Sequence, residues 1–218
     1  MKAFICNKIN GVIPPYMFLH QFNKIMFKKE FLEYRQQMRH DVLAHLKAQP
    51  DAYVSWNYEL DQFTSDAFVE RLITQAQSLR DRYSNPLVIE ISERAINARL
   101  DMVEITKNLQ KVRDAGFKIA LDDFGTEQSN VNRLMRFPID IIKFDKSLID
   151  DAAHDRRAQA TIAALGKLAQ GLDIKVIAEG VETAAQAEFL HEAELYSQQG
   201  YLHSKPLPPE QLGVQAAE

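Results

Sequence analysis

The chain has 218 residues, of which 46% are apolar, so it can build a hydrophobic core and general disorder is excluded. Its formal net charge of −4 gives no indication of affinity for a nucleic-acid polymer or a membrane surface. A single cysteine, Cys6, excludes an internal disulfide and fits a reducing compartment. No apolar run reaches the roughly 18 residues of a membrane span. We therefore expect a cytoplasmic protein, or the cytoplasmic part of a longer or membrane-anchored one.

Short strand-like runs recur along the chain, and each is nearly continuous in apolar residues. Such runs are typical of strands that are buried on both faces of a sheet. We predict seven of them: AFIC (3–6), YVSWN (53–57), VIEIS (88–92), KIALDD (118–123), DIIKFD (140–145), KVIAEG (175–180) and a weaker ELYSQQG (194–200).

Amphipathic helices are predicted between these strands, from apolar residues that recur at helical spacing. A capping-box pattern of Thr183 and Gln186 opens the last of them. The apolar faces of the other three consist of Phe68, Leu72, Ala76 and Leu79; of Met102, Ile105, Leu109 and Val112; and of Ile162, Leu165, Leu168 and Leu172.

This alternation of strand and helix predicts an α/β fold with parallel strands and helical crossovers. Either a (β/α)-type barrel or an open doubly wound sheet would satisfy it. No linker, repeat or low-complexity segment divides the chain, so we expect one domain over residues 1–218.

Polar residues close six of the seven predicted strands, and this favours the barrel. In a TIM-like barrel the functional groups gather at the carboxyl ends of many different strands. The residues at these ends are Asn57, Glu90, Glu93, Asp122, Asp123, Lys143, Asp145, Glu179, Glu182 and Gln199.

Two of these residues, Asp122 and Asp123, are adjacent acids at the end of a buried strand. Like charges at this spacing disfavour each other, so a positive group should face them. Carboxylate and amide oxygens are the ligands that Mg²⁺ and Mn²⁺ prefer. Two such cations can activate a water and stabilise a displacement at phosphorus. Lys143 would then hold that water or offset the developing charge.

Other readings of the same residues are a helix cap for either aspartate and a salt bridge for Lys143. A lysine at a barrel strand end could also form a Schiff base with a carbonyl substrate. The sequence contains no HExxH, GxGxxG, GxSxG or phosphate-binding loop motif, which argues against the chemistries that depend on them.

Five segments resemble the signature segments of the EAL-domain family, bacterial phosphodiesterases that open cyclic di-GMP to linear pGpG. They are VIEISE (88–93), LDDFGT (121–126), IIKFDKS (141–147), IAEGVET (177–183) and QGYLHSKPLP (199–208). The resemblance implies a modified (β/α)₈ TIM-like barrel, two divalent cations, Mg²⁺ or Mn²⁺, and cyclic di-GMP as the ligand. Many relatives are dimers, which makes a homodimer an expectation here.

The resemblance also implies a role for each site residue. Asn57, Glu90 and Asp122 would bind one cation, and Asp122, Asp123 and Glu179 the other. Lys143 would contact the water that attacks the substrate, Gln199 would support the site, and Glu93 would brace the loop after Asp123.

The start of the chain departs from the family pattern. Lys2–Cys6 stands where the family has its Glu-Ala-Leu segment, so Lys2 would replace a metal-binding glutamate and Cys6 a phosphate-binding arginine. The strand that usually precedes this segment is missing, and GTEQSN (125–130) replaces a small Gly- and Ser-rich loop. Two hypotheses therefore stand: an active phosphodiesterase, or an impaired relative that binds cyclic di-GMP or a protein partner. Metal-dependent turnover distinguishes them.

Overall fold

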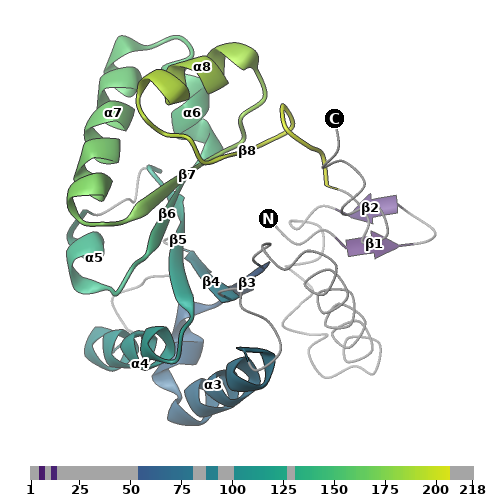
Figure 1. The fold of residues 1–218 in the computed structure, drawn as a ribbon, viewed down its shortest axis with the longest axis vertical. Helices are drawn as coiled ribbons and strands as arrows, with labels where there is room; N and C mark the ends of the chain where they lie inside the picture. Colours follow the sequence, from purple (N-terminus) through teal and green to yellow (C-terminus); the bar gives the residue numbers. More distant parts are fainter. Residues whose placement is uncertain are drawn as a thin grey trace. The chain divides into compact units, whose positions relative to one another are not determined.

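The structure is a computed structural model and describes residues 5–7, 11–13, 54–80, 87–92, 101–126 and 131–206. The chain divides into two compact units. The first contains strands β1 (Ile5–Asn7) and β2 (Gly11–Ile13), and the second contains Ser55–Arg82 and Pro86–Lys205 (Figure 1).

The second unit is built on one six-stranded sheet, whose strands follow one another in chain order. All pairings from β4 to β8 are parallel, as the alternation of strands and helices predicts. The strands are β3 (Val54–Tyr58), β4 (Leu87–Ser92), β5 (Lys118–Phe124), β6 (Ile141–Phe144), β7 (Lys175–Glu179) and β8 (Gln198–Gln199). The predicted α/β fold is confirmed.

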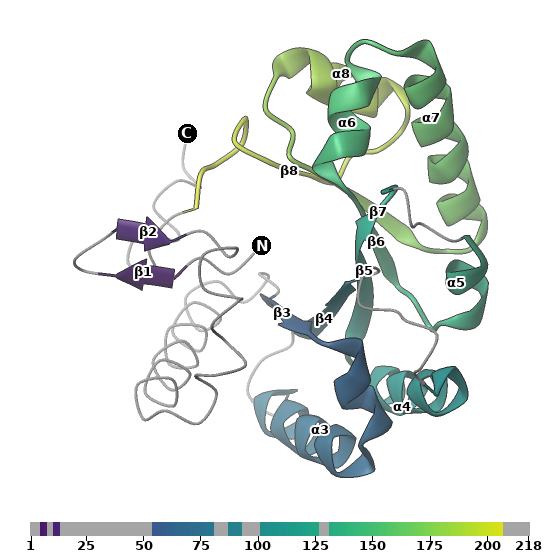
Figure 2. The ribbon, with the colours of Figure 1, turned by 180° about the vertical axis from the view of Figure 1, so that it is seen from behind.

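The helices of this unit lie along the outer side of the curved sheet, as two opposite views show (Figures 1 and 2). The predicted capping box of Thr183 and Gln186 is present and opens the last helix. The helical elements are η1 (Leu60–Thr64), α3 (Asp66–Arg80), α4 (Met102–Asp114), α5 (Val131–Arg136), α6 (Lys146–Ala152), α7 (Arg156–Gly171) and α8 (Ala184–Glu192). None of the helices among the described residues is long and apolar enough to cross a membrane.

Two predictions about these elements are wrong. The first predicted run does not join the parallel sheet, because Ile5–Asn7 pairs antiparallel with Gly11–Ile13 in a separate two-stranded sheet. The predicted apolar face of α7 is also displaced: Leu168 and Leu172 are 36% and 40% exposed. The helix packs instead through Gly166, where an added Cβ would lie 3.1 Å from Leu195 Cδ2, so a small residue permits the close approach.

Candidate active site

Four neighbouring strands build the floor of the candidate site with one apolar residue each. Val88, Ala120, Ile141 and Ile177 form a buried cluster across β4, β5, β6 and β7, which we call the apolar layer. Because side chains alternate between the faces of a strand, the residue two positions further along points to the same side. On these strands that residue is Glu90, Asp122, Lys143 and Glu179.

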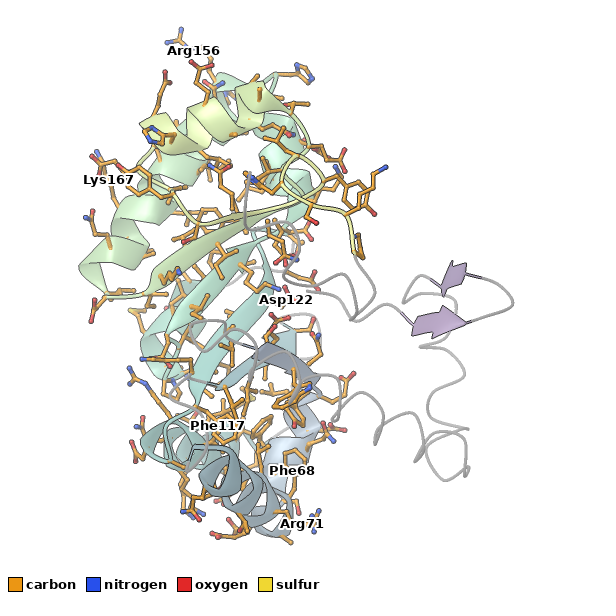
Figure 3. The ribbon with its side chains drawn as sticks, turned by 45° about the vertical axis from the view of Figure 1, so that its right-hand side comes forward. Phe68, Arg71, Phe117, Asp122, Arg156 and Lys167 are labelled. Carbon is orange, nitrogen blue, oxygen red and sulfur yellow. The ribbon has the colours of Figure 1, made fainter. Side chains whose placement is uncertain are left out.

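These four side chains, which we call the charged layer, meet around the ammonium group of Lys143. Lys143 Nζ lies 2.6 Å from Glu179 Oε1, 3.1 Å from Glu90 Oε2 and 3.2 Å from Asp122 Oδ1. All four residues are at least nine-tenths buried. Asp122 lies where the strands end, whereas Arg71 and Arg156 project outward from helices (Figure 3). The structure thus brings four of the predicted site residues into contact.

Burial and charge act in opposite directions on the lysine of the charged layer. Burial lowers the pKa of Lys143, but the charges of Asp122, Glu90 and Glu179 outweigh this and raise its pKa above the ordinary lysine value. Burial raises the pKa of Glu179, although the nearby Lys143 acts to lower it. The charged layer therefore holds one cation against three acidic groups.

A bulge explains how two adjacent acids both remain at the site. Leu121 pairs with Ile142 and Phe124 with Phe144, so β5 carries one more residue than β6 between these pairs. Asp123 takes up the extra length with a φ of 60°. Its Oδ2 accepts a hydrogen bond of 3.3 Å from Ser92 Oγ.

Ser92 lies two residues after Glu90 on β4 and so shares its face of the strand. The hydrogen bond therefore brings the Asp123 carboxylate to the side of the sheet that carries the charged layer. In a regular strand, adjacent side chains would point to opposite faces.

Two other predicted site residues lie on the strands that flank this cluster, β3 and β8. Asn57 is exposed near the end of β3, the strand beside β4. Gln199 is half-buried on β8 and is the pairing partner of Glu179. Glu93 lies outside the described residues, as does Lys2.

Polar residues beyond the strand ends organise the connections. Asp145 caps α6 and accepts hydrogen bonds from Ser147 N at 2.9 Å and Ser147 Oγ at 2.6 Å. Glu182 pairs with Lys146, a residue that sequence reasoning missed. The available signal was spacing, because Lys146 and Glu182 each follow a charged-layer residue by three positions.

The donors of this site fit a hard divalent cation by their chemistry. The buried carboxylates of Glu90, Asp122 and Glu179 share the ammonium of Lys143, and Asp123, next to Asp122, is a fourth buried acid. Such an excess of buried negative charge attracts cations with a preference for oxygen ligands. Within the described part of the chain, no three acidic, histidine or cysteine side chains stand close enough together to hold a metal as they are. In this arrangement Lys143 is the positive group that faces Asp122.

A comparison with known protein families identifies the family of this chain. Residues 8–206 match the model of the EAL domain. The chain belongs to the EAL domain family. The matched range begins after Lys2–Cys6, so the replacement of the family glutamate by Lys2 stays a prediction.

The chain matches a small part of longer curated proteins. The cyclic di-GMP phosphodiesterase NbdA of Pseudomonas aeruginosa is 39% identical over 122 residues, which is 56% of this chain and 15% of NbdA. The chain spans between 15% and 20% of the length of three such relatives, DosP of Escherichia coli, NbdA and YkoW of Bacillus subtilis.

Solved EAL domains have the same fold. The PaMucR phosphodiesterase in complex with c-di-GMP is 29% identical with a TM-score of 0.77, covering 96% of this chain and 84% of that chain. BlrP1 of Klebsiella pneumoniae, solved with calcium and cyclic di-GMP, is 25% identical with a TM-score of 0.69. That match covers 90% of this chain and 48% of BlrP1. Since EAL domains are TIM-barrel-like, the predicted fold class is confirmed.

Proposed function

We propose that this EAL domain is a divalent-cation-dependent phosphodiesterase that opens cyclic di-GMP to linear pGpG. The observation that carries the proposal is the charged layer, in which three buried carboxylates surround one buried ammonium at four neighbouring strand ends. The proposed substrate is supported by the relatives, since NbdA is named a phosphodiesterase of this nucleotide and PaMucR was solved with it.

In this proposal the carboxyl ends of the strands hold two cations, Mg²⁺ or Mn²⁺. When bound, such cations neutralise charge on the phosphate and act as Lewis acids towards it. One would be held by Asn57, Glu90 and Asp122, and the other by Asp122, Asp123 and Glu179. The summed negative charge of these carboxylates exceeds the single positive charge of Lys143, so bound cations would bring the site closer to neutrality.

The reaction is hydrolysis of one of the two phosphodiester bonds. The oxygen of a water molecule forms a bond to phosphorus, the bond from phosphorus to one ester oxygen breaks, and that oxygen leaves with a proton. Lys143, kept charged by its three carboxylate neighbours, would donate a hydrogen bond to the water or to a phosphate oxygen and so stabilise the growing negative charge. Gln199 would support this arrangement through its pairing with Glu179, and Glu93 would brace the loop after Asp123.

The test is to incubate the purified chain with cyclic di-GMP and Mn²⁺ and to follow pGpG by chromatography. Chelator-sensitive formation of pGpG by the wild type, and its loss in Asp122→Asn, is the expected result. Lys111→Met is a suitable control, because Lys111 forms an ion pair between helices, with Asp66 at 2.7 Å, and lies outside the charged layer. Binding of the nucleotide without hydrolysis would instead identify a receptor, and neither binding nor hydrolysis would reject the proposal.

The expected homodimer and the cytoplasmic location are part of the same proposal. Light scattering coupled to size-exclusion chromatography measures the first, and fractionation of cells that express the chain measures the second. A monomer at all concentrations tested would contradict the first expectation, and a membrane-bound pool would contradict the second.

A further inference from the structure

A second ion pair repeats the spacing of the Lys143–Glu179 pair just beyond the strand ends. Lys146 Nζ lies 2.9 Å from Glu182 Oε1, and each residue follows its charged-layer counterpart by three positions. We call Lys146 and Glu182 the outer pair. Both side chains are 45% exposed, whereas Lys143 and Glu179 are buried. The outer pair therefore lies at the surface, over the connections that leave β6 and β7.

The outer pair belongs to a closed ring of polar contacts. Lys146 Nζ also lies 3.3 Å from Asp150 Oδ2, one turn further along α6. Asp150 Oδ1 accepts a hydrogen bond of 3.0 Å from Gln186 Nε2 on α8. Gln186 Oε1 in turn accepts from the backbone N–H groups of Glu182, at 2.9 Å, and Thr183, at 3.0 Å. The ring joins α6, α8 and the connection between β7 and α8.

The stem of Lys146 holds the same connection at a second point. Gly180, the residue directly after Glu179, has a φ of 69°, and an added Cβ there would lie 2.5 Å from both Cβ and Cγ of Lys146. The backbone next to Glu179 is thus pressed against the lysine stem, while the ammonium reaches Glu182. Lys146 contacts the connection on both sides of Val181.

The opposite side of the connection is fixed by β8. Val181 N donates to Gln199 O at 3.1 Å, and Leu202 N donates to Val181 O at 3.0 Å. Residues 180–183 are therefore held between β8 and the first turn of α6. Because Glu179 ends β7 immediately before this segment, a shift of the segment would move the Glu179 carboxylate.

We propose that Lys146 and Glu182 form a positioning pair that holds Glu179 against Lys143. The inference rests on the proposed function for the reaction that this placement serves. A half-exposed ion pair contributes little to stability. A small displacement of a reacting group, in contrast, can reduce the rate by up to about 100-fold. The outer pair should accordingly affect turnover much more than folding.

The matched variants for the test are Lys146→Met and Lys111→Met. Methionine keeps most of the stem that packs on Gly180 and removes the charge. Lys111 also joins two elements through an ion pair, with side chains 36% and 64% exposed for Lys111 and Asp66, but it connects α4 with α3. We expect Lys146→Met to lower kcat about tenfold, the effect typical of partners that orient a site residue. KM and the melting temperature should change little, and Lys111→Met should keep the wild-type kcat.

Three further variants separate positioning from a general structural role. Lys146→Arg keeps the charge and should restore most of the activity. Glu182→Gln should lose as much as Lys146→Met, and the double variant should lose no more than either single one, because both remove the same contact. Equal kcat values for Lys146→Met and Lys111→Met would overturn the proposal, as would additive losses in the double variant.

A measurement that does not depend on activity distinguishes failure of this inference from failure of the proposed function. Amide hydrogen exchange, followed by mass spectrometry on peptides from residues 177–190, should be faster in Lys146→Met and in Glu182→Gln than in Lys111→Met. Unchanged exchange in both variants overturns the positioning pair. If the wild type does not hydrolyse cyclic di-GMP, the proposed function fails, and the exchange result alone decides whether the outer pair holds this segment.

Discussion

The two ends of the parallel sheet balance their buried charges in opposite ways. At the amino end, Asp140 accepts from Arg113 Nη2 at 3.0 Å, from Lys118 Nζ at 3.1 Å and from the backbone N–H of Ile119 at 3.0 Å. One acid thus has two cations and a backbone donor. At the carboxyl end, the single ammonium of Lys143 serves Glu90, Asp122 and Glu179.

The difference is that the buried acid at the amino end has its charge fully compensated, whereas the buried acids at the carboxyl end do not. A buried carboxylate with cations and backbone donors around it needs nothing further. A buried site with more acids than bases remains a place for an added cation. This contrast assigns Asp140 a structural role and supports the functional role that we propose for the charged layer.

Lys143→Met should have the largest effect, because among the described residues it removes the only buried cation at the carboxyl end. Three carboxylates would be left without compensation, and breaking such a buried pair costs about 3–5 kcal/mol of unfolding free energy. Phosphodiesterase activity should fall below detection. Added Mn²⁺ should restore part of the stability, because a ligand that binds the folded state stabilises it. Urea unfolding with and without Mn²⁺ measures this, and equal stability of variant and wild type without the metal would contradict the assignment.

The comparison also indicates what could be predicted from the sequence. The apolar runs and the polar residues that close them located β4 to β7 and placed Glu90, Asp122, Lys143 and Glu179 at one edge. Parallel strands bring their carboxyl ends to the same edge, so the common location of these four residues could be predicted without knowing how their side chains pack.

Short or irregular features could not be predicted in this way. Helices α5 and α6 have 6 and 7 residues, too few for an apolar period to show, and β2 has 3. The bulge at Asp123 depends on the pairing of two strands, and the contacts of Lys143 depend on rotamers in three dimensions. The displaced face of α7 depends on how closely Gly166 approaches Leu195. Each of these is set by tertiary packing rather than by local pattern.

A second substitution tests how β8 supports the carboxyl end. A Cβ at Gly200 would collide with the backbone N and O atoms of Val181, so Gly200→Ala should push β8 away and disturb the pairing of Gln199 with Glu179. We expect a loss of about 1–3 kcal/mol in stability, the usual cost of overpacking, together with lower activity. Gly171→Ala is the control, because an added Cβ there meets no atom within 4 Å. Equal thermal stability of the two variants would show that β8 is free to move.

A smaller effect is expected at the amino end. Asp140→Asn keeps an oxygen that can accept from Ile119 N but removes the charge that attracts Arg113 and Lys118. Because these two cations are 43% and 51% exposed and therefore screened, we expect a loss of about 1 kcal/mol. Activity per folded molecule should not change, as measured by turnover at a temperature well below the transition. A loss of turnover without unfolding would contradict the separation of the two ends.

The smallest effect is expected for the exposed pair of Asp66 and Lys111. The hydrogen bond and charge of Lys111 lower the pKa of Asp66, so the folded state favours the ionised carboxylate. This contribution is present above the ordinary aspartate pKa of about 4 and is lost as the pH falls through the lowered pKa. Melting temperatures of wild type and Asp66→Asn should differ slightly near neutral pH and converge in acid. A difference that grows in acid would have the wrong sign.

The apolar layer has a consequence for how this domain can change over time. Val88, Ala120, Ile141 and Ile177 share their strand faces with the four charged residues, two positions away in each case. A substitution that places a larger side chain in this layer would displace the charged-layer residues that lie next to it. A larger residue in place of Ala120 is therefore expected to alter turnover as well as stability. Selection for packing and selection for chemistry act on the same face of the same four strands.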